Sequence, residues 1–232
     1  MRQRPKILAF DIFGTVVDWH GSIVRELQAL YPQVDGNAFA LAWRAGYQPA
    51  MQRVRSGELG WVRIHELKRM TLDAMLPTFG LEYLSEVERQ HLNRVWHRLD
   101  AWPDSVAGLL RLKTRYTLCT LSNGNIGLLT HMAKRAGLPW DCILSAEVFQ
   151  AYKPDPATYL GVAKVFDVAP EQVMLCAAHH DDLAAARACG LQTAYIERPL
   201  EFGVTQVKDV SPKAGNDFHA RDMLQLAELL GC

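Results

Sequence analysis

The stretch ILAFDIFGTVVDW, residues 7–19, joins a short apolar run to an acid. The run from Ile7 to Phe10 has the length of a strand, and an unbroken apolar run is typical of a strand buried on both faces. Asp11 follows it directly, and Gly14 and Thr15 lie in the turn that comes next. We therefore expect a buried strand that presents the Asp11 carboxylate at its carboxyl end.

Further short apolar runs recur along the chain. They are YTLCTLSN (116–123), DCILS (141–145), QVMLCAA (172–178) and QTAYIE (192–197). Helical patterns alternate with them at 103–115, 125–137 and 181–190, and two of these patterns end at a glycine. Strands and helices in alternation predict an α/β fold with a parallel sheet covered by helices.

Residues 19–98 break this alternation. They contain no convincing strand, but they show amphipathic helical patterns at 22–31, 61–76 and 84–99. A helical block inserted after the first strand would sit above the carboxyl ends of the strands, where open α/β sheets bind ligands. We expect a sheet core built from residues 1–18 and 99–232, with a helical cap at 19–98.

Composition excludes several classes of partner. Lys and Arg total 25 and Asp and Glu also total 25, so no overall field attracts nucleic acid or a membrane surface. No apolar run reaches the roughly 18–20 residues that span a bilayer. The five cysteines are odd in number and form no CxxC pair, which favours free thiols in a reducing cytoplasm. Cys119 and Cys176 lie in strand-like runs and are expected to be buried. The sequence leaves open whether the protein forms a homodimer.

Polar residues follow four of the predicted strands. They are Asp11 and Thr15, Ser122 and Asn123, Lys153 in YKPDPATY, and the run AAHHDD at 177–182. Each piece alone also fits an ordinary turn or helix cap. The carboxyl ends of parallel strands share one edge of the sheet, so the four pieces can converge there. Together they predict an active site.

In these four pieces the chain resembles the haloacid dehalogenase-like hydrolases. FDIFGTVVD, LSNGN, YKPDPATY and AAHHDDLAAARACGL look like the first to fourth motifs of that superfamily. The resemblance implies a Rossmann-like core with a helical cap, in agreement with the coarse prediction above. It also implies that Asp11 is a nucleophile that forms an aspartyl ester with the substrate.

Two positions depart from the phosphatases of the superfamily. Phosphatases carry a second Asp two residues after the nucleophile, where this chain has Phe13. They also carry an acid four residues before Asp182, where this chain has Ala178. The first of these acids is the general acid for the leaving alcohol, and the second helps to hold Mg²⁺, which needs oxygen ligands. Phe13 and Ala178 therefore weaken both the acid and the metal site. We therefore predict neither metal nor cofactor, although Asp181 or Asp182 could still supply ligands.

The chain more closely resembles the L-2-haloacid dehalogenase branch. LAWRAGYQPAM looks like the cap segment whose arginine, here Arg44, binds the leaving halide. The resemblance implies that the N–H groups near Ile12 and Phe13, with Ser122, hold the substrate carboxylate. Arg44 and Asn123 would stabilise the departing halide. The expected reaction converts small (S)-2-haloacids to (R)-2-hydroxyacids.

The same resemblance gives roles to the remaining residues. Lys153 keeps Asp11 ionised and oriented, and Thr15 hydrogen-bonds beside it. Tyr159 matches a tyrosine near the active site, although a packed helix aromatic fits equally well. Water directed by Asp182 then cleaves the ester at the Asp11 carbonyl.

Motif four departs from many relatives, which carry Ser-Ser-Asn-Ala-Trp-Asp at the positions of residues 177–182. His179 replaces the Asn and Asp181 replaces the Trp. His179 is either a general base near neutral pH or a histidine that only hydrogen-bonds to Lys153 or backbone. The alternative functions are a Mg²⁺-dependent phosphatase or phosphonatase and a non-catalytic carboxylate-binding protein. The identity of the halide and the length of the acyl chain stay open.

Overall fold

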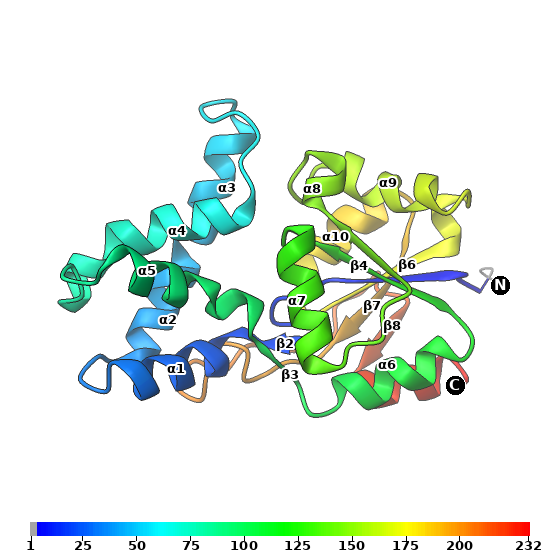
Figure 1. Cartoon of the computed structure of the whole chain (residues 1–232). Helices are drawn as coiled ribbons and strands as arrows, with labels where there is room; N and C mark the ends of the chain where they lie inside the picture. Colours follow the sequence, from blue (N-terminus) through cyan, green and yellow to red (C-terminus); the bar gives the residue numbers. More distant parts are fainter. Residues whose placement is uncertain (1–3) are drawn as a thin grey trace.

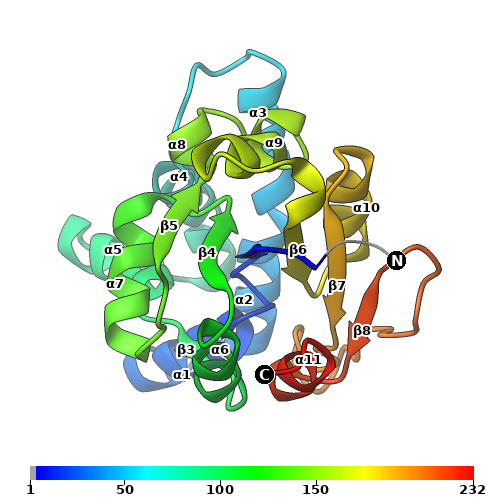
Figure 2. The same ribbon diagram turned by 90° about the vertical axis from the view of Figure 1, so that its right-hand side faces the viewer.

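The computed structural model describes residues 4–232. Six parallel strands form the central sheet, in the order β5-β4-β1-β6-β7-β8. Their bounds are β1 (Ile7–Phe10), β4 (Thr117–Ser122), β5 (Cys142–Ser145), β6 (Val173–Ala177), β7 (Gln192–Ile196) and β8 (Phe218–Ala220). In Figure 2 the sheet runs from β5 on the left to β8 on the right. The predicted α/β class is confirmed.

The side chains of successive β1 residues are buried on opposite faces of the sheet. Leu8 and Phe10 belong to the core shared with α6, α7 and α11, and Ile7 and Ala9 to the core shared with α9 and α10. The helices of the sheet domain are α6 (Ser105–Lys113), α7 (Ile126–Ala136), α8 (Ala146–Phe149), α9 (Pro156–Val165), η3 (Pro170–Gln172), α10 (His180–Ala188) and α11 (Met223–Leu229). Cover on both faces explains why the strand runs are almost wholly apolar.

The segment between β1 and the rest of the sheet is helical. It contains α1 (Trp19–Leu30), α2 (Gly36–Ala45), α3 (Tyr47–Arg55), α4 (Ile64–Met75), η1 (Leu76–Phe79), α5 (Glu86–Asn93) and η2 (Arg94–His97). The chain enters it through β2 (Val17–Asp18) and leaves through β3 (Asp100–Ala101), which pair antiparallel. Figure 1 shows α1 to α5 gathered on one side of the molecule and the sheet with its helices on the other.

Three further features bear on the sequence predictions. Cys119 and Cys176 are both fully buried, as expected. No helix within residues 4–232 is long and apolar enough to cross a membrane. Of the core segment predicted for 1–18, residues 1–3 lie outside the described residues. The limits of cap and core stay a proposal.

Candidate active site

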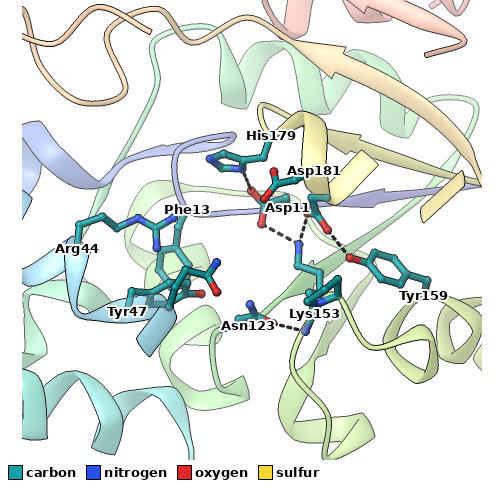
Figure 3. Close-up of a pocket in the computed structure, with 12 residues that line it drawn as sticks. Asp11, Phe13, Arg44, Tyr47, Asn123, Lys153, Tyr159, His179 and Asp181 are labelled. Atoms are coloured by element: carbon teal, nitrogen blue, oxygen red, sulfur yellow. Dashed lines mark hydrogen bonds and ion pairs between the residues drawn. The ribbon is translucent and has the colours of Figure 1, made fainter. Parts of the chain in front are cut away.

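Asp11 lies at the carboxyl end of β1 with its side chain almost wholly buried. Thr15 donates its hydroxyl hydrogen to Asp11 Oδ2 at 2.8 Å, and Lys153 Nζ donates to Asp11 Oδ1 at 3.0 Å. Two donors on different oxygens fix the plane of the carboxylate, and Figure 3 shows the contact from Lys153. The turn after β1 therefore holds Asp11 in one orientation.

Lys153 lies between two carboxylates. Besides Asp11, its ammonium donates to Asp182 Oδ2 at 2.5 Å, and the Tyr159 hydroxyl donates to Asp182 Oδ1 at 2.7 Å. The Lys153 backbone N–H donates to Asn123 Oδ1 at 2.9 Å, which ties the lysine loop to the end of β4. The side chains after β1 and β6 thus meet around the Lys153 ammonium group, and the one after β4 holds the Lys153 backbone.

His179 lies on the other side of Asp11, immediately before α10. Its Nδ1 is 3.1 Å from Asp11 Oδ2, and its Nε2 is 2.9 Å from Glu201 Oε1. Glu201 is fully buried, and Lys208 Nζ donates to its other oxygen at 2.5 Å. His179 therefore connects the predicted nucleophile to a second, buried carboxylate.

These contacts set the charge of each group. Burial opposes ionisation of Asp11, but the Lys153 charge and the His179 hydrogen bond outweigh it and hold the pKa of the carboxyl well below its usual range. Burial also opposes protonation of His179, yet Glu201 and Asp11 raise the pKa of the imidazole to about 9. At neutral pH the resting site holds a carboxylate and an imidazolium.

Asp182 differs from Asp11. Burial raises the pKa of the Asp182 carboxyl, and the Lys153 charge offsets this only in part. Glu201, also buried, has its pKa lowered to about 2, because the charges of His179 and Lys208 outweigh the burial. The Glu201 carboxylate is therefore held ionised more firmly than the Asp182 carboxylate.

Glu201 explains why the turn after β1 contains a glycine. Gly14 has a φ of +88°, and a Cβ there would lie 2.2 Å from Glu201 Oε1. Both the backbone conformation and the close approach require glycine. Glu201 was not predicted as a site residue, and it lies in the long loop between β7 and β8. An acid shortly after the end of β7 was the one signal that could have indicated it.

Arg44 comes from the cap, on α2. Its guanidinium lies over the Tyr47 ring, 4.2 Å from the centroid, and 5.7 Å from the centroid of Trp19. Trp43 is buried and donates its Nε1–H to the Lys68 carbonyl, which fixes α2 to α4. Stacking on aromatic faces fixes the direction of the guanidinium. Figure 3 shows Arg44 reaching in from the cap, across from Lys153.

Cap and core enclose a cavity of about 170 Å³. Its lining comprises Asp11, Phe13, Arg44, Tyr47, Gln48, Asn123, Lys153, Pro154, Tyr159, His179, Asp181 and Asp182. The structure thus brings together most of the predicted site residues, and Thr15 lies buried beneath them. Ile12 and Ser122 are not part of this lining. The Ser122 hydroxyl accepts a hydrogen bond from the Gly124 N–H at 3.0 Å instead.

Phe13 forms an apolar wall where the phosphatases have their second acid. Its ring packs edge-to-face against Trp96 at a centroid distance of 5.7 Å, and Lys68 Nζ lies 3.8 Å from its centroid. Trp96 and Lys68 both belong to the cap. Phe13 therefore joins the core to the cap while it lines the cavity.

The residues present do not fit Mg²⁺. Both oxygens of Asp11 and both oxygens of Asp182 already accept hydrogen bonds from protein donors. Phe13 and Ala178 have no side-chain oxygen to offer, and the Lys153 ammonium lies between the two carboxylates. A hard cation that needs about six oxygen ligands would have to displace this lysine.

Comparison with known proteins agrees with this geometry. Residues 5–190 match the model of the haloacid dehalogenase-like hydrolases. An L-2-haloacid dehalogenase of known crystal structure is 46% identical, with 98% of this chain and 100% of that chain covered and a TM-score of 0.93. A defluorinating L-2-haloacid dehalogenase is 42% identical over 100% of both chains, with a TM-score of 0.95.

A curated relative at lower identity is also a 2-haloacid dehalogenase. (S)-2-Haloacid dehalogenase 1 of Pseudomonas sp. (strain CBS-3) is 28% identical over 207 residues, which is 83% of this chain and 86% of the relative. The chain therefore belongs to the haloacid dehalogenase-like hydrolase family, in the branch of the L-2-haloacid dehalogenases.

Proposed function

We propose that the protein hydrolyses small (S)-2-haloacids to (R)-2-hydroxyacids through an ester on Asp11. The observation that carries the proposal is the Asp11 carboxylate, which is held by hydrogen bonds from Thr15 and Lys153 and faces a small cavity. Arg44 from the cap lines the same cavity. The relatives named above are called L-2- or (S)-2-haloacid dehalogenases. A cavity of about 170 Å³ suits a short acid.

The first step is displacement at C2. A carboxylate oxygen of Asp11 forms a bond to C2 as the carbon–halogen bond breaks, and in-line attack inverts the configuration. Arg44 provides N–H donors for the departing halide. Asn123 is proposed to add an amide N–H donor, since its Oδ1 already accepts from the Lys153 backbone N–H. The N–H groups of Ile12 and Phe13 are proposed to hold the substrate carboxylate.

The second step is hydrolysis of the ester. We assign water activation to His179, supported by its contacts to Asp11 and Glu201. The ester carries no charge, so one of the two carboxylates that raise the pKa of His179 is lost. The imidazolium therefore releases its proton to solvent once the ester has formed. The neutral imidazole takes a proton from water as the hydroxide adds to Cγ of Asp11, and it returns that proton to the departing hydroxyacid oxygen. The remaining proton on the Asp11 carboxyl then passes to His179 and restores the resting carboxylate and imidazolium. Asp182 is less suited, since both its oxygens accept hydrogen bonds.

A His179→Ala enzyme should release one equivalent of halide and then stop as the ester. General-base catalysis is typically worth about 10²–10⁴-fold, so steady-state turnover should fall by that amount. Mass spectrometry of the intact protein after mixing with (S)-2-chloropropionate should show the adduct. If Asp182→Asn accumulates the ester while His179→Ala turns over normally, water activation belongs to Asp182.

Halide release should be unchanged by EDTA. A haloacid brings one carboxylate, which backbone N–H groups and the Lys153 charge can accommodate, whereas phosphoryl transfer usually needs Mg²⁺ to neutralise charge. Hydrolysis of a generic phosphate ester should stay negligible with added Mg²⁺. Loss of turnover in EDTA with recovery in Mg²⁺, or faster hydrolysis of the phosphate ester than of any haloacid, would contradict this account.

Two further proposals complete the assignment. We take residues 19–98 as the cap and 1–18 with 99–232 as the core, supported by the pairing of β2 with β3 where the chain passes between them. We also place the protein in the cytoplasm. Its five cysteines, none of them paired within residues 4–232, suit a reducing compartment.

A further inference from the structure

A second cavity, of about 390 Å³, lies where the cap meets the core, apart from the candidate active site. Six basic side chains line it: His65 from α4, Arg94 and His97 from η2, Arg98 just after η2, and His131 and Arg135 from α7. Within residues 4–232 its lining contains no carboxylate. Its lining differs in charge from that of the cavity around Asp11, which contains carboxylates as well as cations.

Three imidazoles cross the boundary between cap and core in a row. His97 Nδ1 lies 3.0 Å from His131 Nδ1, and His97 Nε2 lies 3.1 Å from His65 Nδ1. His131 belongs to α7 of the core, which packs against η2 of the cap (Figure 1 labels α7). Burial, and then the neighbouring histidines, lower the pKa of His97 to about 3. His97 is therefore uncharged at neutral pH, and arginines line the same cavity.

The three arginines are not neutralised to the same extent. Arg98 pairs with Glu26, and Arg135 pairs with Asp100 at 2.6 Å. Arg94 has neither an ion pair nor a hydrogen bond through its side chain to any of residues 4–232. Its guanidinium, always charged, therefore leaves an unbalanced positive charge at the wall of the cavity.

The chemistry of the lining selects the class of ligand. A divalent cation would have to approach three guanidinium groups, which repel it. A single halide is small for a cavity in the range of about 300–1,000 Å³ that is usual for small-molecule sites. An oxyanion with several oxygens can accept hydrogen bonds from guanidinium and imidazole groups on more than one side.

We propose that this cavity binds an oxyanion carrying two or more negative charges, of the phosphate or polycarboxylate class, and that the ligand links the cap to the core. The site goes beyond the proposed dehalogenase activity and shares no residue with the cavity around Asp11. A bound anion would contact η2 and α4 on one side and α7 on the other. It would hold the two parts of the chain together outside the cavity around Asp11.

Calorimetric titration with inorganic phosphate, and separately with citrate, tests this site in the full-length protein at constant ionic strength. Saturable binding with one equivalent is expected for at least one of the two anions, and the tighter one identifies the class. An Arg44→Gln variant, which removes the arginine of the active-site cavity, should bind as tightly as wild type.

Substitutions in the lining should weaken this binding. Arg94→Gln removes a charge-assisted contact, which is worth about tenfold or more in affinity. Arg53→Gln is the matched control, because it removes the same charge from an exposed cap arginine outside the cavity. His131→Gln, exposed on α7, should also weaken binding and gives a second variant from the core side.

Three results would overturn the proposal. The first is that neither phosphate nor citrate binds saturably. The second is equal weakening by Arg94→Gln and Arg53→Gln, which would mean a general charge effect. The third is loss of binding in Arg44→Gln, which would place the anion in the active-site cavity.

Discussion

An Asp11→Asn enzyme should release halide from (S)-2-chloropropionate about 10⁴-fold or more slowly than the wild type. Removal of a covalent nucleophile typically costs this much or more, because the remaining groups stabilise a transition state that cannot form. The amide has the same shape as the carboxylate. Its oxygen still accepts a hydrogen bond from Lys153, and its NH₂ group can donate to the Thr15 hydroxyl where the carboxylate accepted from it. The variant should therefore fold, and the loss should appear in kcat.

Asp181→Asn is the matched control for this prediction. Asp181 lines the same cavity and undergoes the same change, but it makes no hydrogen bond to Asp11 or Lys153 within the described part of the chain. Its turnover should stay near that of the wild type. If the two variants lose activity equally, the effect comes from the charge of the cavity and not from the nucleophile.

Arg44→Lys should lose about 100-fold or more in turnover. Lysine keeps the charge but lacks the planar fork of donors, and it cannot stack on Tyr47 as the guanidinium does. One preorganised donor in a transition state is typically worth about 10²–10³-fold. Steady-state halide release, with Arg53→Lys as an exposed control on α3, measures the effect. Near wild-type rates in both Arg44→Lys and Arg44→Ala would remove Arg44 from the halide site.

Much of the fold follows from the periodicity of the chain. All five predicted strands are present as β1, β4, β5, β6 and β7, because a strand buried on both faces leaves an apolar run that is easy to recognise. The edge strand β8 was missed. It has only three residues, at the end of a long polar loop, and its pairing with β7 is a tertiary contact.

The cap illustrates where periodicity is insufficient. The pattern at 84–99 predicts one helix, but the structure has α5 followed by the 3₁₀ turn η2. Trp96 in η2 is buried against Trp19, Trp43 and Phe13, which come from three other parts of the chain. These contacts between distant parts of the chain accompany the tighter turn, and a helical pattern alone does not contain them.

The site was predictable where its residues follow strands. Asp11, Asn123 and Lys153 could be found because parallel strands end at one edge of the sheet. Glu201 and Lys208 could not, since they lie in the loop between β7 and β8. Only in the folded protein does Glu201 meet His179 and Lys208 meet Glu201. The alternative that His179 bonds to Lys153 is wrong, because the imidazole contacts Asp11 and Glu201. Ser122 was expected at the substrate, but its hydroxyl caps the following turn.

The most direct test of the central claim is a single turnover in H₂¹⁸O with enzyme in excess over (S)-2-chloropropionate. Water attacks Cγ of the ester in the proposed reaction, so one ¹⁸O atom should enter the Asp11 carboxylate. Mass spectrometry of the peptide that contains Asp11 should show this label, and the lactate from the first turnover should carry none. Label in the lactate with none in the peptide would contradict the covalent route.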